Sequence, residues 1–399
     1  MPPGQFTFTT PYARPDLLHG MDAGLVTEGR LGMRFEDAVP WLHLHRLTGG
    51  GAGLRNLLEH FGSVEAIYAA ARSELLPFFD GDQTPVDAVL AGPDAGQYEA
   101  ERVWLDDPSN NLIAITDPAY PPLLREIPGP PPLLFVRGDA ALLCAPQLAV
   151  VGSRNPSHGG CDNARAFSEQ LTRAGLVVTS GLALGIDACA HAAALDAGGQ
   201  TIAVAATGLD RVYPSAHREL AHRIAAQGAL VSEFALGTPP RREHFPRRNR
   251  LISGLSLGVL VVEAALRSGS LITARLAAEQ GREVFAIPGS IHSPLARGCH
   301  ALIRQGAKLV ETAPDILEEL GALAGFVAAP PGATAIPARA PLDPAQQELL
   351  ELIGFDPVEM DTLIARSGLT PGKVSSMLLF MELCGLIEAR PGGRYQRTS

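Results

Sequence analysis

The chain has 399 residues, enough for two or three domains. Its 46% hydrophobic and 19% charged residues are typical of a globular protein and exclude a chain disordered throughout. No apolar run of about 18 residues predicts a membrane span, and the first residues lack a signal-peptide pattern, so we expect a cytoplasmic protein without a membrane partner. Five dispersed cysteines without a CxxC motif predict neither a disulfide framework nor a zinc site.

The net charge of −10 is spread unevenly along the chain. Residues 1–146 carry 9 basic and 19 acidic side chains, whereas residues 147–320 carry 17 basic and 15 acidic ones. Within the second segment, a run from Arg241 to Arg250 (RREHFPRRNR) holds five arginines and one glutamate. The chain has only two lysines, a composition typical of a GC-rich coding sequence, so any phosphate-binding cation is expected to be arginine. The middle of the chain is therefore the part suited to an anionic partner.

The first part of the chain predicts helices. Residues 1–36 show little apolar periodicity and indicate a loosely ordered leader. In residues 37–111, apolar residues recur at helical spacing, and Thr48–Gly51 separates two helices tightly, as in a helix-hairpin-helix. Such a turn either binds a DNA backbone through its amides or serves only as a packing module, and the local acidity favours the packing module.

Residues 112–320 predict the core. The leading segment, 112–139, indicates one short strand among many prolines. Apolar strands then alternate with helices, at residues 148–151, 176–180, 201–206, 230–234, 259–263, 284–287 and 308–310. This alternation predicts an α/β fold with a Rossmann-like, doubly wound parallel sheet that helices cover on both faces.

Two further segments complete the chain. Residues 321–341 are rich in Ala, Pro and Gly and indicate a flexible linker. Residues 342–399 predict helix, turn, helix and a strand pair, the order of a winged-helix domain. Their charge of −3 argues against strong binding of duplex DNA, and a partner-binding or regulatory role is an equal alternative.

Candidate binding residues follow the predicted strands, because ligands of open α/β sheets bind at the carboxyl ends of the strands. After the first core strand, a loop opens a helix in the manner of an anion site. Its residues are Gly152, Ser153 and Arg154. Later strand ends offer small residues, a cation and a ring, namely Ser180, Gly181, Arg211, Tyr213, Gly269, Ser270 and Thr273.

The arginine run is interpreted as a loop that interrupts the α/β domain. Its candidate residues are Phe245, Arg247, Arg248, Asn249 and Arg250. Guanidinium groups beside an aromatic ring suit single-stranded nucleic acid, since they offer backbone charge and base stacking together.

Catalytic residues are not predicted. Asp187 and His191 lie four residues apart on one helix face, where a packing pair is favoured over acid–base chemistry. Glu263, which ends a strand, is expected to orient an arginine rather than to act as a base. No Ser/His/Asp, Cys/His or metal-ligand pattern accompanies these residues. We therefore expect that the protein is not an enzyme and that it binds neither a cofactor nor a metal.

Five motifs in one order closely resemble the DNA-processing protein A (DprA/Smf) family. They are AVVGSRNPS, SGLALGIDACAH, TGLDRVYPSAH, HFPRRNRLISGLS and EAALRSGSLITA. LTGGGAGLRNLLEHFGSVEAIY is similar to the N-terminal SAM or helix-hairpin-helix module of that family. The resemblance implies an extended Rossmann-like core. It also implies a non-enzymatic homodimer that binds single-stranded DNA and hands it to the RecA recombinase in natural transformation and recombination.

The family's DNA pocket includes a G-S-R loop and an F-P-x-R-N-R stretch. The resemblance places these at Gly152–Arg154 and Phe245–Arg250. Members commonly carry a lysine in the Y-P loop, where this chain has Ser215, and Arg211 is the cation that can replace it.

Two alternatives stay open. A nucleotide-binding enzyme of the phosphoribohydrolase type has a similar layout, but its hallmark PGGxGTxxE is absent. A winged-helix transcription regulator would read duplex DNA, which the charge of residues 342–399 argues against.

Overall fold

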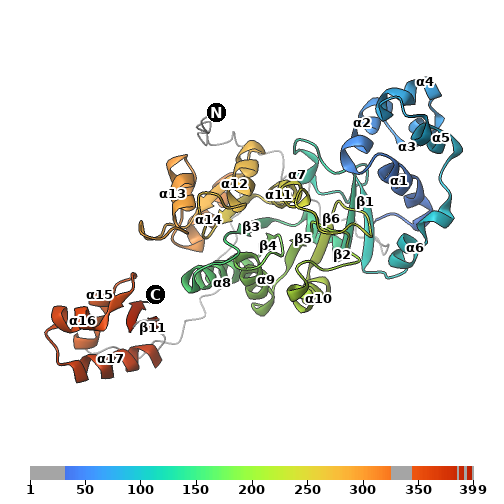
Figure 1. Ribbon diagram of the computed structural model, residues 1–399. Helices are drawn as coiled ribbons and strands as arrows, with labels where there is room; N and C mark the ends of the chain where they lie inside the picture. The colour runs from blue at the N-terminus through green and yellow to red at the C-terminus, as the bar shows by residue number, and fades with distance from the viewer. Residues whose placement is uncertain (1–31, 325–343, 384–385, 391–392, 398–399) are drawn as a thin grey trace. The chain divides into compact units, whose positions relative to one another are not determined.

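The computed structural model describes residues 32–324, 344–383, 386–390 and 393–397. The chain divides into two compact units, residues 1–328 and 329–399 (Figure 1). Most of the predicted leader and linker lies outside the described residues. The first residues of the predicted linker, 321–324, instead complete helix α14 (Ala313–Ala324).

A nine-stranded sheet forms the centre of the first unit, in the order β1-β2-β6-β5-β4-β3-β7-β8-β9. Neighbouring strands from β6 to β9 in this order are parallel. These strands are β3 (Gln147–Val151), β4 (Val177–Ser180), β5 (Thr201–Val204), β6 (Ala229–Ser232), β7 (Gly258–Val261), β8 (Glu283–Ala286) and β9 (Lys308–Leu309). Each predicted core strand is present, so the α/β prediction is confirmed.

The leading segment differs from the prediction. It supplies two strands, β1 (Asn110–Ala114) and β2 (Leu133–Gly138), which pair antiparallel with Ala114 opposite Leu133. β2 also pairs antiparallel with β6, so the sheet is mixed rather than wholly parallel. The prolines are confined to the connection, which includes α7 (Pro122–Arg125), and leave β2 free to donate its backbone hydrogen bonds.

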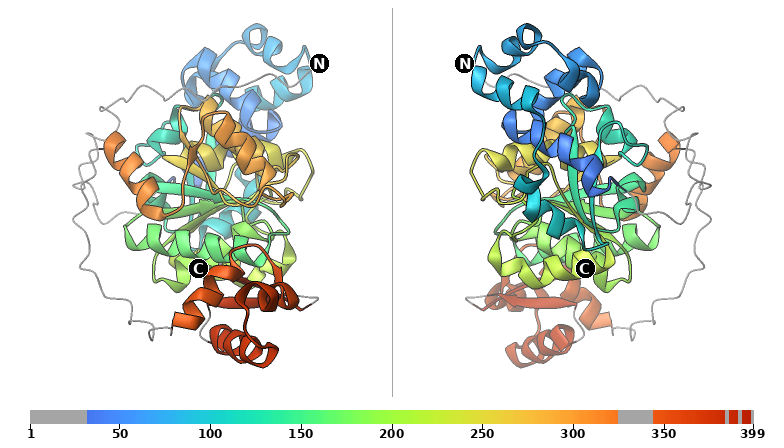
Figure 2. Two further views of the ribbon diagram at one scale, coloured as in Figure 1. Left: turned by 90° about the vertical axis from the view of Figure 1, so that its left-hand side faces the viewer. Right: turned by 90° about the vertical axis from the view of Figure 1, so that its right-hand side faces the viewer.

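Helices cover both faces of this sheet (Figures 1 and 2). On one face lie α8 (His158–Arg173), α9 (Ile186–Asp196) and α10 (Arg218–Gln227). On the other lie α11 (His244–Leu255), α12 (Ser270–Glu279) and α13 (Arg297–Arg304). The side chains of β3 alternate accordingly, because Leu148 and Val150 pack with α8 and α9, whereas Ala149 and Val151 pack with α11 and α12. Burial on both faces explains why the strands are almost wholly apolar.

Among the described residues, six α-helices precede the sheet. They are α1 (Phe35–Leu47), α2 (Gly51–Phe61), α3 (Val64–Ala69), α4 (Arg72–Leu75), α5 (Gln83–Ala91) and α6 (Glu99–Leu105). Their apolar side chains share one core with the sheet, since Leu44 and Leu54 belong to the same buried cluster as Leu112 of β1 and Phe135 of β2. This shared core fixes the helical region on the β1–β2 end of the sheet. Short 3₁₀ helices span Leu76–Phe79, Ala95–Tyr98, Ala140–Cys144 and Ser215–His217.

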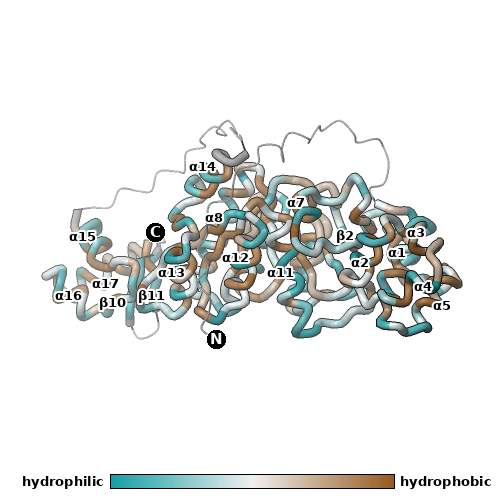
Figure 3. The backbone as a smooth tube through the Cα atoms, turned by 90° about the horizontal axis from the view of Figure 1, so that it is seen from above, coloured by the Kyte–Doolittle hydropathy of each residue, from teal (hydrophilic) through white to brown (hydrophobic). Residues whose placement is uncertain are grey.

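The second unit has its own core, which includes Leu349, Ile353, Leu363 and Val374. Its elements are α15 (Pro344–Ile353), β10 (Val358–Glu359), α16 (Met360–Ser367), α17 (Pro371–Leu383), β11 (Ile387–Arg390) and β12 (Arg394–Arg397). The strands form an antiparallel sheet in the order β10-β12-β11. Three helices and a small sheet in this order confirm the winged-helix prediction. Hydrophobic residues recur along the helices of both units (Figure 3).

One expectation about cysteine is wrong. Cys161 of α8 and Cys189 of α9 form a disulfide, with their Cα atoms 5.7 Å apart. The two residues are 28 positions apart and belong to no cysteine motif, so the pair could not be predicted from local spacing. They meet because β3 and β4 are neighbours in the sheet, which brings the helices that follow them into contact. Within the ranges that the structure describes, no helix combines the length and the hydropathy of a membrane span.

Candidate functional site

A pocket of about 860 Å³ opens at the carboxyl ends of the parallel strands. It lies around the end of β3, where the chain order of the sheet reverses between β4 on one side and β7 on the other. Many of the predicted binding residues line it together: Gly152, Ser153, Arg154, Tyr213, Phe245, Arg248, Asn249, Gly269, Ser270 and Thr273.

The loop after β3 is held close to the start of α9. A Cβ atom on Gly152 would lie 2.6 Å from Cγ1 of Ile186, so this position has no room for a side chain. The amide of Ile186 donates a hydrogen bond to the carbonyl of Ser153 at 3.1 Å. Arg154 projects from this loop into solvent and has no carboxylate partner among the described residues. Its guanidinium is therefore available to an anionic ligand.

An aromatic pair stands beside Arg154. The rings of Tyr213 and Phe245 are 5.6 Å apart at an angle of 57°, and Tyr213 is 48% exposed. The guanidinium carbon of Arg154 lies 5.5 Å from the centre of the Phe245 ring. A flat base can stack on such rings while the arginine binds the adjoining phosphate.

Arg248 and Asp187 are the buried charged residues of the pocket lining and form its floor. Arg248 is 4% exposed, and its Nη1 donates to the carbonyl of Val204 at 3.1 Å. Asp187 accepts hydrogen bonds from the amides of Gly181 at 3.0 Å and Ala183 at 3.3 Å. Burial lowers the pKa of Arg248 to about 10, which still leaves it charged at neutral pH. Burial also raises the pKa of Asp187, an effect that the charge of Arg248 opposes.

Asp187 and His191 are not bonded to each other. The Nδ1 atom of His191 lies 2.7 Å from Oγ1 of Thr201, away from the pocket lining. Burial lowers the pKa of His191 to about 3, so this ring is neutral at neutral pH. The two side chains therefore bind different partners and are not arranged for acid–base chemistry with each other.

Glu263 does not orient an arginine, so that expectation is wrong. Its carboxylate accepts hydrogen bonds from the amide of Ser157 at 2.9 Å and from its hydroxyl at 2.6 Å. Ser157 Oγ in turn accepts from the amide of Gly160 in the first turn of α8. Glu263 thus fixes the start of α8 behind the pocket.

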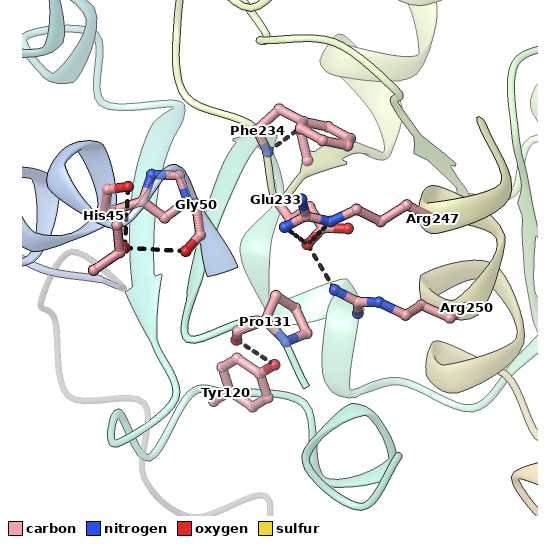
Figure 4. Close-up of polar contacts among 10 residues, drawn as sticks. His45, Gly50, Tyr120, Pro131, Glu233, Phe234, Arg247 and Arg250 are labelled. Carbon is pink, nitrogen blue, oxygen red and sulfur yellow. Dashed lines mark hydrogen bonds and ion pairs between the residues drawn. The ribbon is translucent and has the colours of Figure 1, made fainter. Parts of the chain in front are cut away.

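The arginine run is a helix rather than a loop. From residue 244 onward it forms α11, and only some of its side chains turn toward the pocket. Arg247 and Arg250 lie elsewhere, because both bind the carboxylate of Glu233 at the end of β6 (Figure 4). The closest distances are 2.9 Å and 2.6 Å, and the Glu233 side chain is 1% exposed.

Three other predicted residues also lie outside the pocket lining. Arg211 pairs with its neighbour Asp210 at 2.8 Å. Ser180 is buried and donates its hydroxyl proton to the carbonyl of Val150 at 2.6 Å. Gly181 lies directly against Arg248, since a Cβ atom there would be 1.6 Å from Nη1 of that arginine.

The pocket lining also contains polar residues that were not among the predicted binding residues. These are Asn155, Asp187, Arg242, Arg267 and Ser268. Arg242 belongs to the arginine run, and Arg267 lies in the EAALRSGSLITA motif, so both positions carried a signal. Four arginines thus face one carboxylate in the lining, which makes the pocket cationic. No group of His, Cys, Asp or Glu side chains suited to a metal ion occurs in the part of the chain that the structure describes.

Comparison with known proteins identifies the family. The family model for DNA recombination-mediator protein A matches residues 111–321, and the DprA winged helix domain matches residues 323–393. Protein Smf from Escherichia coli (strain K12) is 48% identical over 297 residues, which cover 74% of this chain and 79% of that protein. DNA processing protein DprA from Streptococcus pneumoniae is 50% identical over 207 residues, covering 52% of this chain and 73% of that protein.

The fold agrees with a solved structure. The X-ray structure of DNA processing protein A from Streptococcus pneumoniae superposes with a TM-score of 0.62 at 38% identity. The match covers 72% of this chain and 99% of that chain. Since the recombination-mediator model spans more than half of the sequence and the relatives match most of their own length, this chain belongs to the DNA recombination-mediator protein A (DprA/Smf) family.

Proposed function

We propose that the pocket binds single-stranded DNA. The observation that carries this proposal is the combination of an exposed guanidinium, a tilted ring pair and a buried arginine around one cavity. A single strand can unstack its bases, so one base can reach Tyr213 and Phe245 while neighbouring phosphates meet Arg154, Arg242 and Arg267. In a duplex the bases are paired inward and cannot enter in this way.

The size of the pocket limits what it holds. Its volume of about 860 Å³ is within the range of sites for small ligands, roughly 300–1,000 Å³. The pocket therefore holds a short stretch of the strand, and the remaining nucleotides lie over the surface outside it. Binding is expected to depend mainly on phosphate charge, with little sequence preference.

Binding is favoured over hydrolysis. Asp187 is the carboxylate that lines the pocket, and its oxygen is committed to the amides of Gly181 and Ala183. A buried, hydrogen-bonded carboxylate of this kind shapes a loop rather than activating water. The phosphoribohydrolase alternative predicts release of free base from nucleotides, which we do not expect.

We further propose that the protein acts as a homodimer in the cytoplasm and delivers its DNA to the RecA recombinase in natural transformation and recombination. Membership of a recombination-mediator family supports this role. The test is the rate at which RecA filaments form on a single strand covered by single-strand-binding protein. We expect the protein to raise this rate. For the winged-helix unit, we propose a partner-binding or regulatory role.

Fluorescence anisotropy with labelled single-stranded and duplex oligonucleotides tests DNA binding directly. We expect the single strand to bind more tightly and its affinity to fall steeply as salt increases. Failure to bind a single strand at low salt would overturn the proposal. A preference for duplex would instead support the winged-helix regulator.

Replacing Arg154 with alanine is expected to weaken binding to single strands of every sequence. Loss of one phosphate contact makes the decrease of log affinity with log salt shallower, by about 0.7 in slope. The salt series measures both quantities. Arg173→Ala, which removes an exposed arginine at the end of α8, is the matched control and is expected to leave them unchanged. An unchanged slope for Arg154→Ala would remove this residue from the site.

Replacing Phe245 with alanine is expected to cost about 1–3 kcal/mol of binding free energy through lost stacking. The sharp comparison uses a strand with abasic sites, which keeps the phosphates but offers no ring. Wild-type protein and Phe245→Ala should bind the abasic strand equally. If Phe245→Ala instead weakens binding to the abasic strand as much as binding to the normal strand, Phe245 acts by positioning Arg154 rather than by stacking on bases.

A further inference from the structure

The Cys161–Cys189 disulfide lies directly behind the DNA pocket. Cys161 is in the first turn of α8, which follows the loop that carries Arg154. Cys189 is in the first turn of α9, which also holds Asp187 of the pocket floor. The bond therefore joins the starts of the two helices whose preceding loops form one wall of the pocket.

These two loops are also in direct contact. The amide of Ile186 donates a hydrogen bond to Ser153, as described above. In addition, Gly185 packs closely against the loop that carries Ser153 and Arg154. A Cβ atom on Gly185 would lie 2.3 Å from the carbonyl oxygen of Ser153 and 2.7 Å from that of Arg154. Because contacts this close leave no free space, a shift of α9 against α8 must move the backbone of Arg154.

The two cysteines are suited to thiol exchange. Both are only half-buried, so a small thiol can reach them. Both lie at helix N-termini, where the positive end of the helix dipole favours a thiolate. The two free cysteines within the described residues differ, because burial raises the thiol pKa of Cys144 and raises that of Cys299 to about 12.

We propose that Cys161 and Cys189 are a redox-active pair that exchanges with low-molecular-weight thiols and controls the affinity of the pocket for single-stranded DNA. In oxidation, one cysteine thiolate attacks a small disulfide, forms a mixed disulfide and releases one small thiolate. The second cysteine thiolate attacks the protein sulfur of that mixed disulfide and releases the other. Two protein thiols are oxidised, and one small disulfide is reduced to two thiols.

The oxidised protein is the form with the tighter pocket. The bond holds the starts of α8 and α9 together and so fixes Arg154 relative to Asp187 before DNA arrives. Without it, DNA binding must order these loops itself. We expect reduction to weaken single-strand affinity about fivefold, at the low end of coupling between distinct sites. This effect rests on the proposed function.

The test uses the full chain after equilibration with either reduced or oxidised glutathione. Peptide mass spectrometry reports the Cys161–Cys189 link, and anisotropy reports affinity for a labelled oligothymidine. We expect oxidised wild type to bind more tightly than reduced wild type. Cys161→Ser and Cys189→Ser should both match the reduced protein under either condition, whereas the control Cys144→Ser should respond like wild type.

The outcomes separate this proposal from the proposed function. Equal affinity of linked and reduced wild type would overturn the redox control while leaving DNA binding intact. Two free thiols after treatment with oxidised glutathione would overturn the exchange itself. If neither redox form binds the oligonucleotide, the proposed function fails. A Cys161–Cys189 link together with a higher melting temperature of the oxidised protein would then show that the disulfide only stabilises the fold.

Discussion

Replacing Glu233 with glutamine is expected to lower the free energy of unfolding of the first unit by about 3 kcal/mol. The Glu233 carboxylate is 1% exposed and binds the guanidinium groups of Arg247 and Arg250 (Figure 4). Helix α2 begins beside it, since a Cβ atom on Gly51 would lie 3.5 Å from Oε2 of Glu233. The neutral variant therefore leaves two guanidinium groups and a helix N-terminus facing one another without a negative charge.

Urea denaturation measures this loss. The two tryptophans of the chain, Trp41 and Trp104, both lie in the first unit, so their fluorescence follows its unfolding without interference from the winged-helix unit. Glu279→Gln is the matched control, because Glu279 pairs with Arg275 at the surface, where such a pair contributes at most about 1 kcal/mol. A loss for Glu233→Gln no larger than the control would contradict the role of Glu233 as the buried counter-charge.

The same ion pairs explain why the arginine run could be predicted only in part. Once the run forms α11, residues three and four apart share a face. Phe245, Arg248, Asn249 and Ile252 follow this spacing and line the pocket, whereas Arg247 and Arg250 form another face and meet Glu233. The interpretation of the run as a loop assigns no helix faces, so it could not separate the residues that line the pocket from those that bind Glu233. Charge alone could not reveal it, because Glu233 precedes Arg247 by 14 residues.

Strands that are evident from their own sequence were predicted correctly, whereas features that depend on contacts between distant segments were not. Strands β3 to β8 were evident because burial on both faces makes them predominantly apolar. The antiparallel addition of β1 and β2 depends on pairing between segments that prolines separate, and the disulfide depends on the neighbouring positions of β3 and β4. The strand-end loops were predictable since the position of a ligand site follows from the topology of the sheet.

Replacing Gly181 with alanine is expected to reduce single-strand affinity about tenfold by displacing a charged donor, even though Gly181 itself does not line the pocket. The new Cβ atom would lie 1.6 Å from Nη1 of Arg248, so the guanidinium must leave its place. That place is buried and includes the hydrogen bond to Val204, so the side chain has no equivalent position nearby. The anisotropy assay measures the loss.

Gly269→Ala is the matched control, because a Cβ atom on Gly269 meets nothing within 4 Å although this residue does line the pocket. A double-mutant cycle then separates steric displacement from other effects. In an Arg248→Ala background, Gly181→Ala should cause no further loss of affinity, since the donor that it displaces is already gone. An additive loss would show that Gly181 acts instead through the hydrogen bond that its amide donates to Asp187. The floor of the pocket would then depend on the loop rather than on the arginine.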